Sequence, residues 1–350
     1  MSKIREYHLF AGIGGGIYGG KLLGHKCVGG VEILEYARGV LEQRKKDGWM
    51  DEDMDLSHTD ITKLNGAEIA GKFDVLCGGF PCQAFSLAAH GKNIAEKNLW
   101  DHMFRVVQES CAPIVFGENV SVEAIDKAAK DLESVGYRVE YIRLGCEDLG
   151  ADHRRNRFWL LAVRNDENGT NTFAKMSEKL SKLPKLTGKC WTKSPLMTGC
   201  AVEVKEADRR KQLLGVGNAQ SPFVAATAFR ILANRLLRPQ SAREITVNKK
   251  ELSKVFAKRK TWMTREFREG KNPDRQIEGL VHTPTTMANY CYPSMLIQHA
   301  GCRNYVKVFC EGRPNTVSRP EPVEAEYLMG FPLGASSPNP LTKDNIEKWG

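Results

Sequence analysis

Long apolar segments are missing from this chain of 350 residues. There is no run of about 18 apolar residues, and the opening MSKIREYHLF lacks the hydrophobic region that secretion signals carry. These absences argue against membrane-spanning and secreted proteins, so we expect a cytoplasmic protein with no membrane partner. Hydrophobic residues still make up 41% of the sequence, with 6 Trp and 14 Phe, which is enough for a sizeable core.

Closely paired cysteines are missing as well, because none of the 10 cysteines belongs to a Cys-x-x-Cys motif. Zinc sites commonly use such pairs, whereas disulfide scaffolds are typical of short secreted chains. We therefore predict free thiols and no bound metal.

The net charge of +9 is unevenly distributed. Residues 1–164 hold 21 Lys and Arg against 24 Asp and Glu, whereas residues 165–350 hold 30 against 18. The surplus falls within residues 165–264, which hold 20 basic and 8 acidic residues. Such a stretch is either a solvated, lysine-rich surface or a patch that binds a polyanion such as nucleic acid.

Short apolar runs alternate with stretches of helical spacing in the first 164 residues. The apolar runs are YHLF, CVGGV, FDVLC, PIVFG, YRVEYI and FWLLAV, and helical spacing occurs at 34–46, 98–110 and 122–135. This alternation predicts an α/β fold with a doubly wound, mostly parallel sheet and helices on both faces. From residue 241 onward no helical period is evident, so we place a domain boundary between 238 and 245.

Ligands of such a sheet bind beyond the carboxyl ends of its strands. The first strand leads into FAGIGGGIYGG, residues 10–20, where glycines let a ligand approach the turn and the following helix N-terminus. Glu32 ends the second apolar run, and Asp60 in SHTDIT ends a further expected strand. Taken singly, the glycine-rich segment could be only a tight connection, Glu32 could open the following helix, and Asp60 could cap the residues after it. Together they favour a cofactor with an adenosine group.

Cys82 follows Pro81 in the glycine-rich segment GGFPCQAFS. It is either a thiol packed in a turn or a nucleophile, which needs an exposed, electropositive setting. Glu118 ends the neighbouring run FGEN and suits a general acid or a helix cap. Arg155 and Arg157 lie two apart before FWLLAV, so an extended backbone would point both to one face. These neighbours favour the nucleophile.

Four segments, FAGIGGG, GGFPCQAFS, ENV and HRRNRFWLLA, resemble in order and spacing the motifs of the cytosine-C5 DNA methyltransferases. Residues 213–236 resemble the last motif of that family, a helix that closes the cofactor pocket, and residues 322–332 resemble the penultimate one. The resemblance implies a Rossmann-like, S-adenosylmethionine-dependent methyltransferase fold and a smaller, irregular target-recognition domain. It covers residues 7–164, 209–237 and 319–334.

The resemblance also implies roles for the matching residues. Cys82 would add to C6 of a cytosine, and Glu118 would contact N3 and supply a proton. Arg157 would bind the cytosine O2, while Arg155 and Asn119 would position the loop and the base. The cofactor S-adenosylmethionine would be bound at the matching positions, which are Phe10, Gly12, Gly14, Glu32, Ile33, Asp60, Ile61, Pro81, Leu99 and Asn218.

Double-stranded DNA is the partner that the resemblance implies. The target cytosine must leave the helix, because a stacked base hides C6. The polar segment 86–98 would close over the flipped base, and the basic surplus of 165–264 would bind the backbone. No obligate protein partner is evident, although a cognate restriction endonuclease would suit this function. The candidate DNA contacts are Gln83, Ser86, Lys92, Arg303 and Arg313.

The order of the two late motifs departs from the family, in which the penultimate motif comes first. Either the order is rearranged, with residues 241–318 as a displaced recognition module, or one match is false. We divide the chain into a catalytic core (1–164), a basic connecting segment (165–208), a helix completing the core (209–240) and a target-recognition domain (241–350). Target recognition then belongs to 165–208, 241–318 or parts of both. Asp152 stands where the family commonly has proline.

Three other functions remain open. An RNA methyltransferase acting on tRNA would share the chemistry of Cys82 and Glu118 and differ in substrate. A catalytically silent DNA-binding protein would keep the fold, although every residue that the chemistry needs is present. A dinucleotide oxidoreductase would give Cys82 and Glu118 no shared task. We therefore predict DNA cytosine-C5 methylation.

Overall fold

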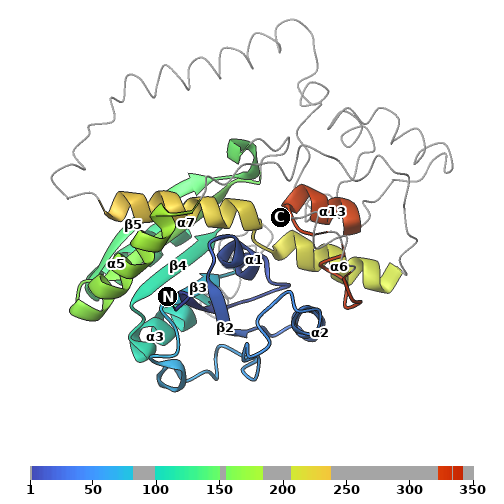
Figure 1. Ribbon diagram of the computed structural model, residues 1–350, viewed down its shortest axis with the longest axis horizontal. Helices are drawn as coiled ribbons and strands as arrows, with labels where there is room; N and C mark the ends of the chain where they lie inside the picture. Colours follow the sequence, from blue (N-terminus) through green and yellow to red (C-terminus); the bar gives the residue numbers. More distant parts are fainter. Residues whose placement is uncertain are drawn as a thin grey trace, which may run out of the picture.

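A six-stranded sheet runs through the computed structural model of the chain (Figure 1). The structure describes residues 2–81, 99–149, 155–183, 206–237, 322–332 and 334–341. The strand order is β2-β1-β3-β4-β6-β5, with β6 antiparallel to both neighbours and the other pairs parallel. The predicted α/β fold with a mostly parallel sheet is confirmed. The strands are β1 (Arg5–Leu9), β2 (Lys26–Val31), β3 (Val75–Gly79), β4 (Ile114–Asn119), β5 (Tyr137–Leu144) and β6 (Arg157–Arg164).

Helices cover both faces of the sheet (Figure 1). The helices expected at 34–46, 98–110 and 122–135 are confirmed as α2, α3 and α4. Short 3-10 turns occur at η1 (Gly66–Ile69) and η3 (Cys146–Leu149). The α-helices are α1 (Gly15–Leu22), α2 (Glu35–Lys46), α3 (Leu99–Ser110), α4 (Val122–Ser134), α5 (Glu167–Ser181), α6 (Glu206–Asn218), α7 (Pro222–Leu236) and α13 (Pro322–Met329).

The side chains of each central strand alternate between two apolar cores. In β3, Val75 and Cys77 belong to the core under α5 and α7, whereas Leu76 belongs to the core under α3 and α4. Successive side chains of a strand point to opposite faces, so a continuous apolar run suits a strand that is covered on both sides. The run FDVLC therefore forms a buried central strand, as expected.

A third apolar cluster joins the segment 322–341 to α1, α2 and α6. Arg44 of α2 anchors this segment. Its side chain is fully buried, donates hydrogen bonds to the carbonyls of Gly334 (3.1 Å) and Asn339, and lies 3.0 Å from Asp47 Oδ2. The two late segments that resemble family motifs thus lie side by side in one core, because α6 and α13 both contribute to it.

Two local expectations were wrong. The strand expected to end at Asp60 does not form, and the described segment has only an isolated bridge between Gly29 and Asp55. Asp60 instead accepts hydrogen bonds from Thr62, which favours a turn over a strand. Residues 213–236 form two helices, because α6 ends at Asn218 and Pro222 starts α7.

Four described cysteines, Cys27, Cys77, Cys111 and Cys146, are free thiols, as expected. The other cysteines lie outside the described residues. Within the described ranges, no helix has the length and apolar character needed to cross a membrane.

We expect Arg44→Met to loosen the segment 322–341 from α2. The substitution leaves the buried carboxylate of Asp47 without its ion-pair partner, and it removes the hydrogen-bond donor of two carbonyls. Loss of one partner of such a buried pair lowers the free energy of unfolding by about 3 kcal/mol. Urea unfolding measures the loss, and Lys130→Met is the control, because it breaks an exposed pair with Asp126 worth about 0.5 kcal/mol or less. Equal, small losses in both variants would show that Arg44 is not an anchor.

Candidate active site

The carboxyl ends of four parallel strands meet at one edge of the sheet. Leu9 of β1 pairs with Val31 of β2 and Gly78 of β3, and Gly79 of β3 pairs with Glu118 of β4. This register brings the glycine-rich turn, the end of β2, the turn after β3 and the end of β4 to the same edge, where sheets of this type bind ligands.

Glu32 holds the glycine-rich turn in place. Its Oε2 accepts a hydrogen bond from the Gly12 N–H at 2.7 Å, and its Oε1 accepts one from the Leu34 N–H at 2.8 Å. Gly12 has φ of 56°, in the left-handed region that favours glycine. Ile33 is 68% exposed beside this buried carboxylate. A carboxylate with lone pairs to spare next to an exposed apolar side chain suits a ribose and an adenine.

Phe10 and Gly14 belong to the same turn, with φ of 56° and 93°. Gly14 is the N-cap of α1, and a Cβ there would lie 2.4 Å from Met50 Cε. A side chain at Gly14 would therefore collide with Met50. The turn leads directly into the N-terminus of α1, where unpaired N–H groups attract polar ligands.

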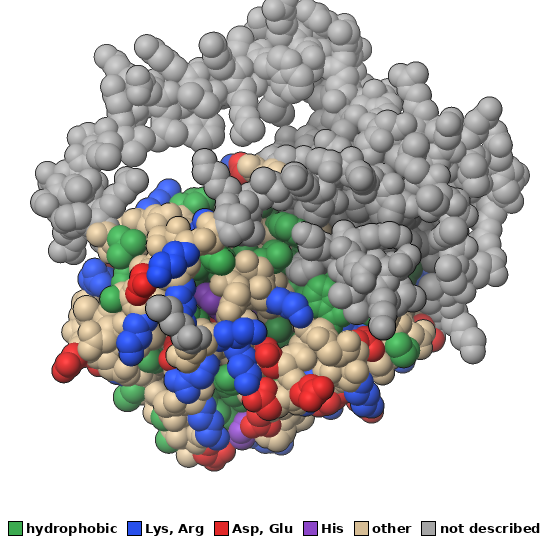
Figure 2. Space-filling model, in the orientation of Figure 1, with side chains coloured by type: hydrophobic (Ala, Val, Ile, Leu, Met, Phe, Trp, Pro, Cys, Tyr) green, Lys and Arg blue, Asp and Glu red, His purple; other side chains and the backbone are tan. Residues whose placement is uncertain are grey.

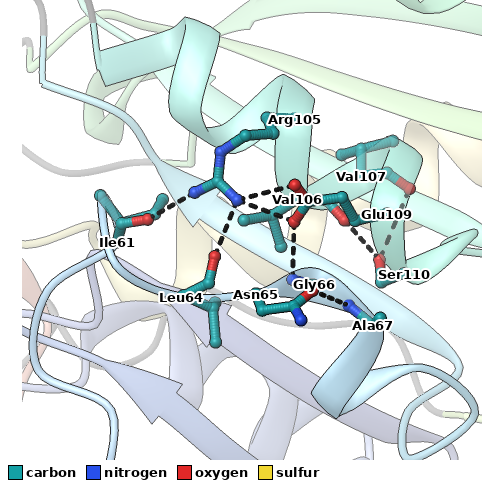
Figure 3. A network of polar contacts seen from close by, with 10 residues as sticks. All are labelled: Ile61, Leu64, Asn65, Gly66, Ala67, Arg105, Val106, Val107, Glu109 and Ser110. Atoms are coloured by element: carbon teal, nitrogen blue, oxygen red, sulfur yellow. Dashed lines mark hydrogen bonds and ion pairs between the residues drawn. The ribbon is translucent and has the colours of Figure 1, made fainter.

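The loop after Asp60 is held against α3 (Figure 3). Arg105 donates hydrogen bonds to the carbonyls of Ile61 and Leu64, each at 2.8 Å, and Glu109 accepts one from the Gly66 N–H at 2.7 Å. The Ile61 side chain is itself buried in the core under α3. The network thus fixes the backbone that carries the Asp60 carboxylate.

Glu118 lies at the end of β4 and is 7% exposed. Its Oε1 is 3.1 Å from Nε of Arg157. Burial raises the pKa of the Glu118 carboxyl, although Arg157 and Arg155 act to lower it. A buried carboxyl with a raised pKa at a ligand-binding edge suits a general acid.

Asn119 ties β4 to the turn that leads to Cys82. Its Nδ2 donates a hydrogen bond to the Phe80 carbonyl at 2.8 Å, and its Oδ1 accepts one from the Ser121 N–H at 2.9 Å. Pro81 follows directly and is partly exposed. Asn119 therefore fixes the backbone from which the chain continues to Cys82.

Arg155 does not lie on an extended segment, as the spacing to Arg157 suggested. Its φ is 40°, and the buried guanidinium donates through Nη2 to the carbonyls of Gly217 (2.8 Å) and Ala219 (2.5 Å). Burial lowers its pKa to about 9. The reason for the difference is this pair of carbonyls at the end of α6, which direct Arg155 toward the α6–α7 corner.

Gln220 is a residue that the sequence did not single out. It lies between α6 and α7, and its side chain is hydrogen bonded to Glu118. Glu118 and Gln220 are separated by 101 residues in the sequence, so only the fold brings them together. A glutamine after GNA carries no chemical signal of its own.

A buried polar cluster under α1 and α7 was also missed. Glu6 accepts hydrogen bonds from His8 (Nε2, 3.0 Å) and His25 (Nδ1, 2.6 Å), which lower its pKa to about 2 against the opposing effect of burial. Glu6, His8 and Cys77 also offer metal-type donor atoms within 4.8 Å of one another. Both carboxylate oxygens are already hydrogen bonded, so the contacts explain the cluster as a structural network.

The remaining predicted residues fall into two groups. Leu99 opens α3, and Asn218 ends α6 with an exposed side chain. The others lie outside the described residues, and these are Cys82, Gln83, Ser86, Lys92, Asp152, Arg303 and Arg313.

The charge surplus is only partly visible in the described core. Figure 2 shows Lys and Arg side chains lying among Asp and Glu side chains on the described face. Much of the basic stretch 165–264 lies outside the described residues. The choice between a solvated surface and a nucleic-acid patch therefore stays a prediction.

A family model for C-5 cytosine-specific DNA methylase matches residues 4–333, which is most of the chain. The chain belongs to this family. Within this family, it is similar to the type II methyltransferase M.HhaI of Haemophilus parahaemolyticus, with 32% identity over 183 residues, 49% of this chain and 52% of that protein. It is also similar to M.CviJI of Paramecium bursaria Chlorella virus IL3A, with 30% identity, 47% of this chain and 44% of that protein.

The chain spans about half the length of the curated relatives it matches. Among solved structures, it is similar to the Entamoeba histolytica methyltransferase EhMeth, with 14% identity, a TM-score of 0.42, and coverage of 61% of this chain and 67% of that chain.

We expect Glu118→Gln to stabilise the protein at neutral pH. Because burial raises the pKa of Glu118 above its ordinary value of 4.5, the folded state binds this proton more tightly than the unfolded state. Stability should therefore fall as the pH rises through the folded-state pKa. Melting temperatures measured from about pH 4 to about pH 8 should show an advantage of the variant that disappears toward the acidic end.

The exposed Glu123 provides the control, since hydrogen bonding to Ser121 lowers its pKa. Glu123→Gln should not show the advantage at neutral pH. A Glu118→Gln protein that melts below the wild type at neutral pH would mean that the ion pair with Arg157 outweighs the cost of burial.

Proposed function

We propose that this protein transfers a methyl group from S-adenosylmethionine to C5 of a cytosine in double-stranded DNA. The observation that carries the proposal is the Glu118 carboxyl, which is buried, has a raised pKa and lies at the strand edge beside Gly79 and Arg157. A general acid in this state is what addition of a nucleophile to a cytosine ring requires. Family membership supplies the substrate class.

The cytosine ring gains its reactivity from groups of this chain. The Cys82 thiolate adds to C6, and Glu118 supplies a proton to N3, so that the electron pair of the former C5–C6 double bond becomes available at C5. S-adenosylmethionine supplies an electrophilic methyl group. Loss of the C5 proton to water then supplies the electron pair that re-forms the C5–C6 double bond and breaks the S–C6 bond. N3 returns its proton to Glu118, which restores the aromatic ring, the carboxyl and the free thiolate. Arg157 binds O2, and Asn119 keeps the turn before Cys82 in place.

The described end of the sheet fits the cofactor. Glu32 is buried with lone pairs that remain for ribose hydroxyls, and Ile33 offers an exposed apolar surface for adenine. The glycine-rich turn leaves space for the methionine part beside the N-terminus of α1. We assign the surrounding contacts to the remaining candidates, which are Phe10, Gly12, Gly14, Asp60, Ile61, Pro81, Leu99 and Asn218.

Target recognition belongs, in this proposal, to residues 241–318. Support comes from the two ends of this stretch, because α7 before it packs on the sheet and α13 after it packs against α6. An insertion between two packed helices can carry recognition without disturbing the catalytic residues. Arg303 and Arg313 are the candidate base contacts within it, and Gln83, Ser86 and Lys92 are the candidates near Cys82. The segment 165–208 is the alternative.

We place the protein in the cytoplasm, where it would meet DNA. Moving the target base out of the duplex would cost a few kcal/mol of lost stacking. A cognate restriction endonuclease is the protein partner that would suit this activity. Methylation of tRNA by the same residues is the second candidate, since the described residues around Glu118 contact the base rather than the sugar in this mechanism.

Expression in a host without cytosine methylation tests the proposal. We expect 5-methylcytosine at one defined sequence across the host genome, and its complete loss with Cys82→Ser, because a serine hydroxyl is far less nucleophilic than a thiolate. Genome-wide mapping of modified cytosines is the measurement, with host tRNA mapped in parallel. Marks in tRNA alone would replace DNA by RNA as the substrate, and unchanged marks with Cys82→Ser would contradict the mechanism.

A further inference from the structure

Three glycines, two at the start of α1 and one at the end of β3, form a slot that holds Gln220. A Cβ on Gly15 would lie 2.2 Å from the Gln220 carbonyl oxygen, and one on Gly16 would lie 2.6 Å from its Oε1. A Cβ on Gly79, in the turn before Cys82, would lie 3.0 Å from its Nε2. Real Cβ atoms do not show contacts this short, and at Gly15 the contact is with backbone, so Gln220 requires glycine there. At Gly16 any Cβ would push the end of the Gln220 side chain out of its present position.

The slot brings the Gln220 amide to the carboxyl of Glu118. The same Cβ position at Gly79 is 3.0 Å from Gln220 Nε2 and 3.0 Å from Glu118 Oε2. The two side chains are hydrogen bonded, and this bond acts to lower the pKa of Glu118. An amide N–H only donates, so the carboxyl oxygen that receives it serves as an acceptor.

The two oxygens of Glu118 therefore have different surroundings. Oε2 lies beside the amide of Gln220, whereas Oε1 is buried and accepts no hydrogen bond from the described residues. Among the described residues, Oε1 forms an ion pair with Arg157 Nε at 3.1 Å, and the charge of Arg155 acts on the same carboxyl. A proton bound by Glu118 is thus expected on Oε1, the oxygen without an amide donor.

The position of Gln220 is fixed by the chain around it. Arg155 donates to the carbonyls of Gly217 and Ala219 immediately before Gln220, and Pro222 begins α7 immediately after it. Gln220 is therefore held at both ends of a short connection between two packed helices, which limits its side chain to few positions.

We propose that Gln220 is a positioning residue for Glu118, because its amide engages Oε2 and leaves Oε1 to exchange a proton with the substrate base. This inference rests on the proposed methylation of cytosine. When a cytosine O2 takes the guanidinium of Arg157, Oε1 loses its direct ion pair and becomes free to carry the proton for N3. Gln220 keeps the carboxyl oriented while that exchange takes place.

The first test does not require activity. Carbon-13 NMR of the Glu118 carboxyl in the free, full-length protein follows its titration in the wild type and in Gln220→Met, which removes the amide at similar volume. The charged groups that face the carboxyl, Arg155 and Arg157, are retained in both. We expect Glu118 to titrate at higher pH in the variant, because a hydrogen bond that favours the charged form has been lost. An unchanged titration would overturn the proposal.

The second test measures methylation of duplex DNA. Gln220→Met should lower kcat by about tenfold with KM for DNA little changed, since orientation of the acid and not binding is impaired. Gln220→Glu should regain activity at acidic pH, where its protonated carboxyl can donate in place of the amide. A loss that appears only in KM, or no regain with Gln220→Glu, would contradict a positioning role.

Gln212→Met is the matched control. Gln212 is a buried glutamine of α6 that is hydrogen bonded to Tyr36, so its substitution removes the same amide away from Glu118. It should leave the Glu118 titration unchanged, and a shift as large as that of Gln220→Met would overturn the proposal. If the wild type methylates no DNA, the proposed function fails, while the NMR titration still decides the role of Gln220.

Discussion

A carboxyl group shielded from water lies where four strand ends meet, and most of the site is arranged around it. Glu118 is buried beside two arginines whose charge opposes the effect of burial on its pKa, and the effect of burial is the larger. Arg157 pairs with it directly, while Arg155 directs its hydrogen bonds to the α6–α7 corner. A carboxyl held between these opposing influences changes protonation with a small change in its surroundings, as general acid catalysis requires.

The positions of these groups depend on packing far from the site. The sheet register aligns the ends of β1, β3 and β4, and the helices on both faces keep the strands buried. The segment 322–341 completes the core around α2 and α6 through Arg44. Residues from both ends of the chain thus support the same edge, in spite of the unusual order of the late motifs.

Local patterns predicted much of this fold. The alternation of apolar runs and helical spacing indicated the six strands and the helices α2, α3 and α4 correctly, because these patterns reflect the residues that each element contributes to the cores. It failed at Asp60, where side-chain hydrogen bonds to Thr62 favour a turn, and at Arg155, where two distant carbonyls determine the side-chain direction. Gln220 and the Glu6 cluster could not be found, since their partners meet only in three dimensions.

The central claim is that Cys82 attacks a cytosine that Glu118 activates. Trapping with a DNA duplex containing 5-fluorocytosine in place of cytosine tests it most directly, because fluorine at C5 prevents the elimination that would release the enzyme. With S-adenosylmethionine present, mass spectrometry of the digested complex should find the base attached to the peptide that contains Cys82. An intact protein with no attached DNA, or attachment at another cysteine, would contradict the account.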